Sequence, residues 1–296
     1  YVGGVSQVIK EGENGFLFNI DASALEYADK IKDTFNTPAT YSQLRKTARK
    51  NFEERLNWNR WLDKSNKIIE RLASEHQPDF YLPVYVINMK ERVERKQHII
   101  KEFDNKEEFE LNLVEASVHP IGAVGLWNSM IKIIKMAKEK GDDIIVICED
   151  DHYFTENYSP KLLFKEVTEA YIQGAEVLSG GIGGFGQAIP AGYHRYKVDW
   201  FWCTQFIVVY NRFFDKMLDY SFQDTDTADG VISKLATNKM VIYPFISEQK
   251  DFGYSDVTQS NMEQQGKIRE HFAKANKRME FVSQSNIQSN IPKNYF

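Results

Sequence analysis

The chain has 296 residues, of which 42% are hydrophobic and 27% are charged, a composition typical of globular proteins. Its formal net charge of −5 leaves no basic excess to neutralise phosphates, which argues against non-specific nucleic-acid binding. No apolar run approaches the roughly 20 residues of a membrane-spanning helix, and two cysteines are too few for a disulfide framework. We therefore expect a cytoplasmic protein, with peripheral contact to the inner face of the membrane allowed. Because the chain opens at Tyr1 without a methionine, we also expect it to be a piece of something longer.

Two unequal parts are predicted, covering residues 1–76 and 84–296. The segment between them, residues 74–83, is polar and contains two prolines, as linkers often do. The first part contains too little apolar material for an independent domain of ordinary stability. We expect it to lean on the second part or on residues that are not present here.

The first part reads as a glycine turn, a short strand at 16–18 and three helices. The first helix has Asp21 or Ser23 as its N-cap, and the second begins near Thr40. The third carries an apolar stripe that begins with Trp58. This part is therefore rich in helix.

The second part begins with a strand–helix–strand–helix–strand pattern. The strands are expected at 84–89, 111–117 and 144–148, and the helices at 90–103 and 125–141. Gly141 is a suitable C-cap for the second helix. This alternation predicts an α/β fold with a mostly parallel sheet flanked by helices. Further strands and short helices follow, with a last helix over residues 263–278.

Three consecutive acids, Glu149, Asp150 and Asp151, follow the apolar strand Ile144–Cys148. Carboxylates at the carboxyl end of a buried strand repel one another unless a positive group lies among them, and a divalent cation is the usual remedy. Glu149 and Asp151 are then the candidate ligands of Mn²⁺ or Mg²⁺ that bridges a diphosphate. The alternative is a solvated acidic loop without a function.

Polar residues also follow the first strand of the second part. Asn88 lies at its carboxyl end, and Arg92 and Arg95 share one face of the next helix. Their guanidinium groups can meet a phosphate through paired N–H groups. The alternative is a solvated helix surface whose arginines pair with Glu91 and Glu94.

Two further stretches carry groups that a transfer reaction uses. A base is needed to take a proton from an acceptor hydroxyl, and Asp224, Asp226 and Asp229 precede an apolar helix. Asp229 is the first choice, although acids before a helix are also ordinary caps. Further candidates to line the acceptor side are Asp251, Tyr254 and Asp256. The sequence alone does not decide among the candidates for the base or for the acceptor side.

Aromatic and glycine residues add two expectations. Alternation along "DWFW" puts Trp200 and Trp202 on one face and Phe201 on the other. One tryptophan can then be a platform for a sugar ring, with a hydrophobic core strand as the alternative. The segment "SGGIGGFGQ", residues 179–187, holds five glycines and is expected to be a mobile loop beside the donor site.

Three ordered motifs give the second part a family resemblance. They are "VINMKERVER", then Gly122, Gly125 and Ser129, then "IIVICEDDHYF". Over residues 84–258 the chain resembles glycosyltransferase family 25, the lipopolysaccharide-type and collagen-type galactosyltransferases of the GT-A fold. In one departure, Met130 stands where that family has a histidine.

The resemblance implies a GT-A-like, nucleotide-sugar-binding domain over residues 84–296. It implies that Glu149 and Asp151 are ligands of the metal, and that Asn88, Arg92, Arg95 and Asp150 form the rest of the donor site. It places an acid near Asp229 and implies inversion at the sugar. The implied donor is a nucleotide sugar, a UDP-sugar first, and the acceptor is a glycan or lipid-linked saccharide in lipopolysaccharide or other cell-surface polysaccharide assembly.

Residues 1–76 resemble the C-terminal end of family 4 glycosyltransferases of the GT-B fold. The matching pattern is Gly-Gly, a short hydrophobic step, "GENGFLF", an aspartate and a helix. Gln7 lies where that family usually has glutamate, and the paired glutamates that hold the nucleotide sugar lie upstream of the match. We interpret this part as a fragment of a GT-B domain without catalysis of its own.

Three functions compete on the sequence alone. The first is a metal-dependent glycosyltransferase. The second is a catalytically silent GT-A-like module that binds glycan or positions a partner. The third is a metal-dependent phosphohydrolase, which normally needs a further cluster of histidine or aspartate ligands, whereas the six histidines here are scattered.

Overall fold

A computed structural model describes residues 5–75, 81–254 and 266–289. The chain divides into two compact units, Tyr1–Asp79 and Phe80–Phe296, and this division lies within the linker range 74–83. None of the helices in the described part is long and apolar enough to cross a membrane.

The first unit is helical, as expected. Its elements are α1 (Val5–Val8), α2 (Ala24–Asn36), α3 (Pro38–Asn51), a π-helical turn (Phe52–Leu56) and α4 (Trp58–Glu75). Ser23 is the N-cap of α2, with a full capping box to Glu26. The strand expected at 16–18 is wrong, because no neighbouring strand lies beside it and only an isolated bridge forms between Glu11 and Gly15.

The first unit has almost no core among its described residues. Thr34 is the single residue there that is buried, whereas the side chains of Ile20 and Trp58 are 89% and 77% exposed. Burial of apolar area is the main stabilising contribution in a domain, so these helices gain little from packing against one another. This agrees with the low apolar content of the sequence.

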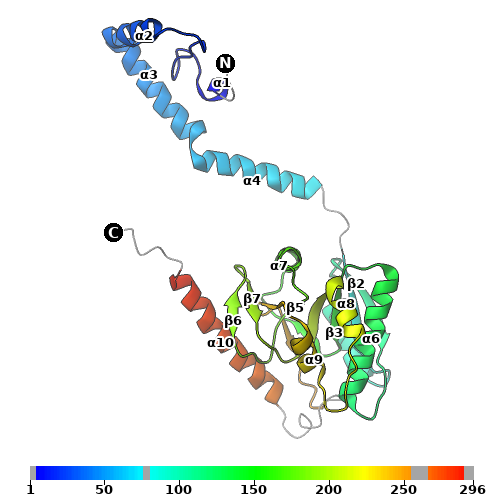
Figure 1. The fold of residues 1–296 in the computed structure, drawn as a ribbon. Helices are drawn as coiled ribbons and strands as arrows, with labels where there is room; N and C mark the ends of the chain where they lie inside the picture. The colour runs from blue at the N-terminus through cyan, green and yellow to red at the C-terminus, as the bar shows by residue number, and fades with distance from the viewer. Residues whose placement is uncertain (1–4, 76–80, 255–265, 290–296) are drawn as a thin grey trace. The chain divides into compact units, whose positions relative to one another are not determined.

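The second unit is an α/β domain, which confirms the expected fold class (Figure 1). Its strands are β1 (Leu82–Asn88), β2 (Phe109–Glu115), β3 (Ile144–Glu149), β4 (His152–Phe154), β5 (Val177–Ser179), β6 (Ala188–Pro190), β7 (Arg195–Val198), β8 (Phe206–Tyr210), β9 (Lys239–Ile242) and β10 (Ser247–Gln249). Its helices are α5 (Val93–Glu102), α6 (Gly122–Lys140), α7 (Pro160–Ile172), α8 (Asn211–Leu218), α9 (Ala228–Leu235) and α10 (Lys267–Ser289).

Eight of these strands form one sheet in the order β2-β1-β3-β8-β5-β9-β7-β6. Strand β1 pairs parallel with β2 and β3, and β5 pairs parallel with β9, while β8 runs antiparallel between β3 and β5. Strands β4 and β10 form a separate antiparallel pair. The parallel half follows the predicted pattern, because crossover helices connect parallel strands.

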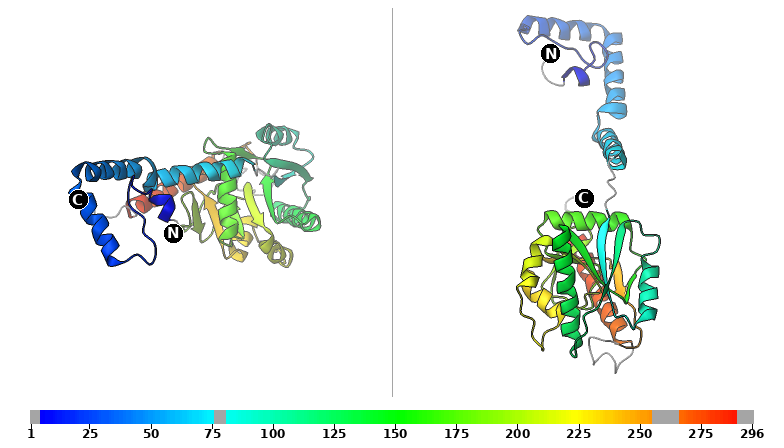
Figure 2. Two further views of the ribbon diagram at one scale, coloured as in Figure 1. Left: turned by 90° about the horizontal axis from the view of Figure 1, so that it is seen from above. Right: turned by 90° about the vertical axis from the view of Figure 1, so that its right-hand side faces the viewer.

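Helices cover both faces of the sheet (Figure 2). Side chains of α6, α8, α9 and α10 form one core, and those of α5 and α7 form the other. The strands are buried on both faces, so successive residues of β1 alternate between the two cores, Tyr85 in the first and Val86 in the second. Gly141 ends α6 in the left-handed conformation, with φ 79°.

The glycine-rich segment 179–187 is not the mobile loop that its composition suggested. Residues 179–185 are buried, and a Cβ on Gly181 would lie 2.0 Å from the carbonyl oxygen of Ser247. A Cβ on Gly180 would lie 2.9 Å from the ring of Phe206. Because glycine has no side chain, the backbone of this segment can pack closely against neighbouring segments. The glycines here therefore serve packing rather than flexibility.

We expect Gly181→Ala to lower the free energy of unfolding by about 2–3 kcal/mol, because the backbone of Ser247 must move away. Gly141→Ala is the matched control: its Cβ would have no neighbour within 4 Å, so only the left-handed φ opposes it, at about 1 kcal/mol. Urea denaturation of both variants measures the difference. Equal losses would mean that Gly181 is not needed for packing.

Candidate active site

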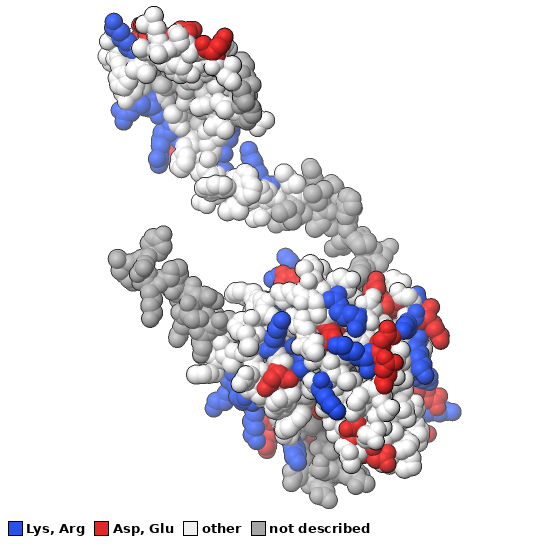
Figure 3. Space-filling view, viewed as in Figure 1, with Lys and Arg blue, Asp and Glu red and all other residues white. Residues whose placement is uncertain are grey.

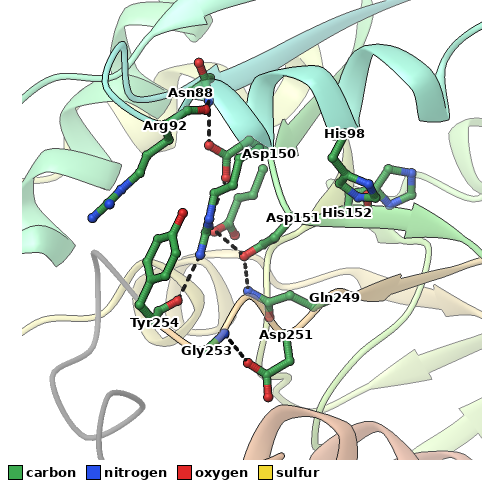
Figure 4. Close-up of polar contacts among 12 residues, drawn as sticks. Asn88, Arg92, His98, Asp150, Asp151, His152, Gln249, Asp251, Gly253 and Tyr254 are labelled. Atoms are coloured by element: carbon green, nitrogen blue, oxygen red, sulfur yellow. Dashed lines mark hydrogen bonds and ion pairs between the residues drawn. The ribbon is translucent and has the colours of Figure 1, made fainter. Parts of the chain in front are cut away.

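The three acids lie where β3 ends and the chain turns into β4. Strand β1 pairs with β3 through Ile87 and Glu149, so Asn88 ends at the same edge of the sheet. The side-chain amide of Asn88 donates to Asp150 at 2.7 Å (Figure 4). The hydroxyl of Thr204 donates to Glu149 at 2.7 Å. The ends of β1 and β3 and the residues just before β8 therefore supply the acidic group and its first partners.

Arg95 is the positive group among the acids. Its Nη1 donates to Asp150 at 3.0 Å and to Asp151 at 3.3 Å, and its Nη2 donates to the carbonyl oxygen of Tyr254 at 2.9 Å. The side chain is buried and lies against the rings of Phe252 and Tyr254, at 4.9 and 4.7 Å from their centroids. Burial opposes its charge, but Asp151 and Asp150 raise the pKa of Arg95 above its ordinary value.

Asp151 keeps one carboxylate oxygen without a partner. Its Oδ2 accepts from Arg95 and from Gln249 at 2.8 Å, while its buried Oδ1 has no hydrogen-bond partner. A buried charged oxygen without a partner is unfavourable unless a ligand meets it. Three carboxylates face one guanidinium here, so further positive charge is favourable.

These residues fit a hard divalent cation that is also bound by substrate. Such ions are commonly held by one or two carboxylates together with phosphate oxygens and water. Glu149 and Asp151 would supply those carboxylates. Within the described residues, no group of three or more His, Cys, Asp or Glu side chains is arranged to hold a metal by itself.

Burial raises the pKa of Glu149 to about 8, with the charge of Asp151 adding to it. Burial also raises the pKa of Asp151 to about 6, against the opposing effects of Arg95 and Gln249. Unfolding returns the two groups to ordinary values of 4.5 and 3.8. The folded protein therefore binds more protons than the unfolded chain between about pH 4 and 8, and stability falls as pH rises through that window.

We expect the free energy of unfolding of metal-free protein to fall by on the order of 5 kcal/mol between about pH 5 and 8, with Glu149 contributing the larger part. Denaturation in a chelating buffer at a series of pH values measures it. Glu149→Gln should flatten the dependence, whereas Glu115→Gln, an exposed residue at the end of β2, should leave it unchanged. A stability that rises with pH in the wild-type protein would contradict this prediction.

Asp229 lies in the first turn of α9 and lines the same cleft as the acids. Its Oδ1 accepts from the hydroxyl of Thr227 at 2.6 Å and from the amide of Gly230 at 2.8 Å. Among the described residues, its Oδ2 accepts from the amide of Cys203 alone, at 3.2 Å. Thr227 is the N-cap of α9, and Asp229 shares the amide of Gly230 with it, so one of the two carboxylate oxygens of Asp229 serves the helix start and Oδ2 is turned to Cys203.

The other acidic candidates lie elsewhere. Asp226 accepts from the hydroxyl of Tyr220 and the amide of Gln223, which closes the turn before α9. Asp251 accepts from the amides of Gly253 and Gly266. Neither carboxylate lines the cleft that holds Asp229 and Glu149. Asp256 lies outside the described residues.

The cleft itself has a volume of about 690 Å³. One wall comes from the end of β1, residues 116–119 and the start of α6; the other comes from residues 202–204, residues 227–229 and the start of α10. The acids lie between these walls, at the carboxyl edge of the parallel strands. Open α/β sheets bind ligands at this edge, and the volume lies in the range of small-molecule sites.

The glycine motif shapes the first wall. A Cβ on Gly125 would lie 2.6 Å from the carbonyl oxygen of Ser117, so glycine lets this loop pack on α6. The hydroxyl of Ser129 accepts from the amide of Ser117 and donates to the carbonyl oxygen of Gly125, both at 2.8 Å. Met130 is fully buried in the core, so the position that departs from the family pattern does not face the cleft.

The predicted donor-site residues take different positions. Asp150 and Arg95 pair with each other, and both line the cleft. Arg92 lies over the ring of Tyr254, with 4.3 Å between its guanidinium carbon and the ring centroid. Asn88 is buried and contacts Asp150. Their roles toward a nucleotide, and those of Glu149 and Asp151 toward a metal, stay predictions.

Sequence reasoning missed Thr204, Gln249 and the cleft residues of α10. Thr204 lies just before β8, which runs antiparallel to β3, so its start lies beside the end of β3. Gln249 reaches Asp151 through the pairing of β10 with β4. Nothing local in the sequence marks these residues, because both contacts depend on strand pairing.

Fold and cleft together define an α/β protein with a cleft lined by acidic residues at the carboxyl ends of its parallel strands. No protein-family model matches the sequence, and no curated protein matches it. An apo UDP-glucose pyrophosphorylase structure is similar at 10% identity and a TM-score of 0.36, over 67% of this chain and 82% of that one.

Two other solved structures are similar to the same degree. One is a glycosyltransferase involved in glycosylation of the major capsid of PBCV-1, with 11% identity, a TM-score of 0.31, and coverage of 46% of this chain and 63% of that one. The other is a mannose-1-phosphate geranyltransferase from Thermus thermophilus, with 10% identity, a TM-score of 0.34, and coverage of 62% and 79%. Similarities this low carry no argument about activity.

Proposed function

We propose that the second unit is a metal-dependent glycosyltransferase. It transfers a sugar from a nucleotide-sugar donor, a UDP-sugar first, to a hydroxyl of a glycan or lipid-linked saccharide. One observation supports this proposal above the others: Asp151, which keeps a buried carboxylate oxygen without a partner, and Asp229, whose carboxylate the amide of Cys203 anchors, line the same cleft. A transferase needs a place for a diphosphate and a base for the acceptor within one cavity.

Glu149 and Asp151 would hold Mn²⁺ or Mg²⁺. When bound, the cation supplies neutralising charge to the diphosphate leaving group. Asp229 takes the proton of the acceptor hydroxyl. At the same time the oxygen of that hydroxyl bonds to the anomeric carbon of the donor, and the bond between this carbon and the phosphate oxygen breaks. Thr204 orients Glu149, and the amide of Cys203 orients Asp229. The result is inversion at the sugar.

The surface charge agrees with a small-molecule donor rather than nucleic acid. On the face in Figure 3, basic and acidic side chains of the second unit are interspersed. Such a surface lacks the single-sign field that attracts a polyanion. The relation of the first unit to GT-B glycosyltransferases remains our proposal from its sequence pattern, with no separate catalysis assigned to it.

A second candidate function is a catalytically silent module that binds glycan. Arg95 already pairs with Asp150 and Asp151. This contact favours the silent module, because it partly neutralises the acids without a metal. In this alternative the triplet holds the end of β3 against α5 and β10. Nucleotide binding separates the two candidates.

Calorimetric titration of UDP, then GDP and CMP, with and without Mn²⁺, tests the proposal. We expect one nucleotide to bind only with Mn²⁺, and Asp151→Asn to weaken that binding at least about tenfold, because a charged ligand is lost. The matched control is Asp143→Asn, because Asp143 precedes the amino end of β3, at the other end of the strand from the acids. Folded wild-type protein that binds none of the nucleotides would leave the silent module as the better explanation.

A further inference from the structure

Trp202 is an exposed aromatic side chain within the cleft. Its side chain is 48% exposed, whereas Trp127 in the core is 2% exposed. Trp202 lines the cleft together with His271, and Trp200, two residues earlier, does not line it. Large exposed aromatic surface inside a cavity is unfavourable in water, so it marks a surface that a ligand covers.

The indole of Trp202 has a fixed position. Its backbone forms an antiparallel bridge with the glycine-rich segment: the amide of Trp202 donates to Gly184 at 3.1 Å, and that of Gly183 donates to Trp202 at 3.0 Å. A Cβ on Gly184 would lie 2.7 Å from Cε3 of the indole, so the ring rests directly on the backbone of that residue. A rigid aromatic surface binds a ligand with little loss of entropy.

Trp202 is linked directly to the acids of the cleft. The next residue, Cys203, donates its amide to Asp229, and Thr204 donates its hydroxyl to Glu149. Cys203 adopts the left-handed conformation, with φ 76°, which is unfavourable for any residue but glycine. This bend turns its amide toward Asp229 and the following side chain toward Glu149. A ligand stacked on the indole of Trp202 is therefore next to Cys203, whose amide holds the candidate base Asp229.

His271 completes this part of the cleft from α10. Its ring meets the indole edge to face, with 5.6 Å between centroids. Burial, and then Lys267 and Lys274, lower the pKa of His271 below its ordinary value, so the ring is neutral at neutral pH and carries one donor and one acceptor nitrogen. Among the described residues, no hydrogen bond engages either nitrogen. A sugar ring fits this arrangement, because its C–H groups can stack on the indole face while one of its hydroxyls hydrogen-bonds to a nitrogen of His271.

We propose that Trp202, with His271 beside it, binds the acceptor as a pyranose ring whose C–H face stacks on the indole and whose reacting hydroxyl faces Asp229. This inference rests on the proposed transferase function and names the acceptor part of the same cleft. It also selects Trp202 over Trp200, which the sequence pattern left equivalent. Trp202 is then a determinant of acceptor binding and takes no part in holding the nucleotide.

The test uses the whole chain and three variants: Trp202→Ala, the conservative Trp202→Phe, and Tyr193→Ala as the control, an exposed aromatic residue outside the cleft. Trp200 does not serve as the control, because its ring contacts that of Trp202, with 5.1 Å between centroids. Methyl β-D-glucopyranoside, methyl β-D-galactopyranoside and methyl α-D-mannopyranoside are the probes, and saturation-transfer NMR measures their contact with the protein. We expect wild-type protein and Tyr193→Ala to transfer saturation to ring C–H protons of at least one glycoside. Trp202→Ala should weaken that binding about tenfold, and Trp202→Phe should retain part of it.

A parallel titration of UDP with Mn²⁺ keeps the two proposals distinguishable. We expect Trp202→Ala to bind the nucleotide as the wild-type protein does, which also shows that the variant is folded. Equal glycoside binding by wild type and Trp202→Ala, or none by a wild-type protein that binds UDP, would overturn the acceptor subsite. Loss of UDP binding in Trp202→Ala, with an unchanged thermal unfolding curve, would assign the indole to the donor site and would also overturn the acceptor subsite. Glycoside binding through Trp202 without nucleotide binding by the wild type would overturn the transfer function and the acceptor role together, leaving a glycan-binding module.

Discussion

Replacing Arg95 with methionine is expected to lower the free energy of unfolding of the second unit by about 3–5 kcal/mol, because Asp150 and Asp151 would then be buried without their cation. For a unit of this size the loss corresponds to a midpoint of thermal unfolding roughly 6–20 °C lower. Methionine has a similar length and keeps the contact with the rings of Phe252 and Tyr254. The loss therefore reports on charge rather than on packing. Equilibrium denaturation at neutral pH measures it.

Two further variants make this result specific. Lys96→Met, the exposed next residue of α5, should change stability by less than about 0.5 kcal/mol. Asp150→Asn combined with Arg95→Met should recover part of the loss, because one of the two unpaired charges is removed. If Arg95→Met unfolds at the wild-type midpoint, the acids do not depend on the guanidinium, and solvent or a bound ion neutralises them instead.

Asp229→Asn is expected to lower the rate of sugar transfer about 10²–10⁴-fold, because the amide cannot accept the proton of the acceptor hydroxyl. Asparagine keeps the shape of the side chain and an oxygen to accept from Thr227 and Gly230. UDP binding with Mn²⁺ should be unchanged, and kcat should fall much more than KM rises. Release of UDP from the donor in the presence of a saccharide acceptor measures the rate.

Asp226→Asn is the matched control for that experiment, because its carboxylate closes the turn before α9 outside the cleft. We expect its rate to stay within about threefold of wild type, because its carboxylate does not line the cleft in which the reaction would take place. Transfer by Asp229→Asn at the wild-type rate would exclude Asp229 as the base. A loss of UDP binding in that variant would instead assign the residue to the donor.

The sequence predicted the elements that depend on local patterns. Apolar runs and 3.6-residue periodicity located β1, α5, β2, α6 and β3 to within a few residues, and Gly141 marked the end of α6. The same patterns failed where packing decides the conformation. Gly181 belongs to a buried segment because the backbone of Ser247 lies against it, and that neighbour is 66 positions away along the chain.

By itself, the sequence determined that three acids end a buried strand at the carboxyl edge of a sheet, since strand direction and side-chain order are local properties. Only the tertiary structure decided what meets them. Arg95, separated from Asp150 by 55 residues, lies between two of the acids, and Asp229 alone of three nearby aspartates lines their cleft. The physical reason is that ion pairs and cavities form between segments distant in the chain, where pairing of strands and packing of helices, rather than sequence spacing, fix which side chains meet.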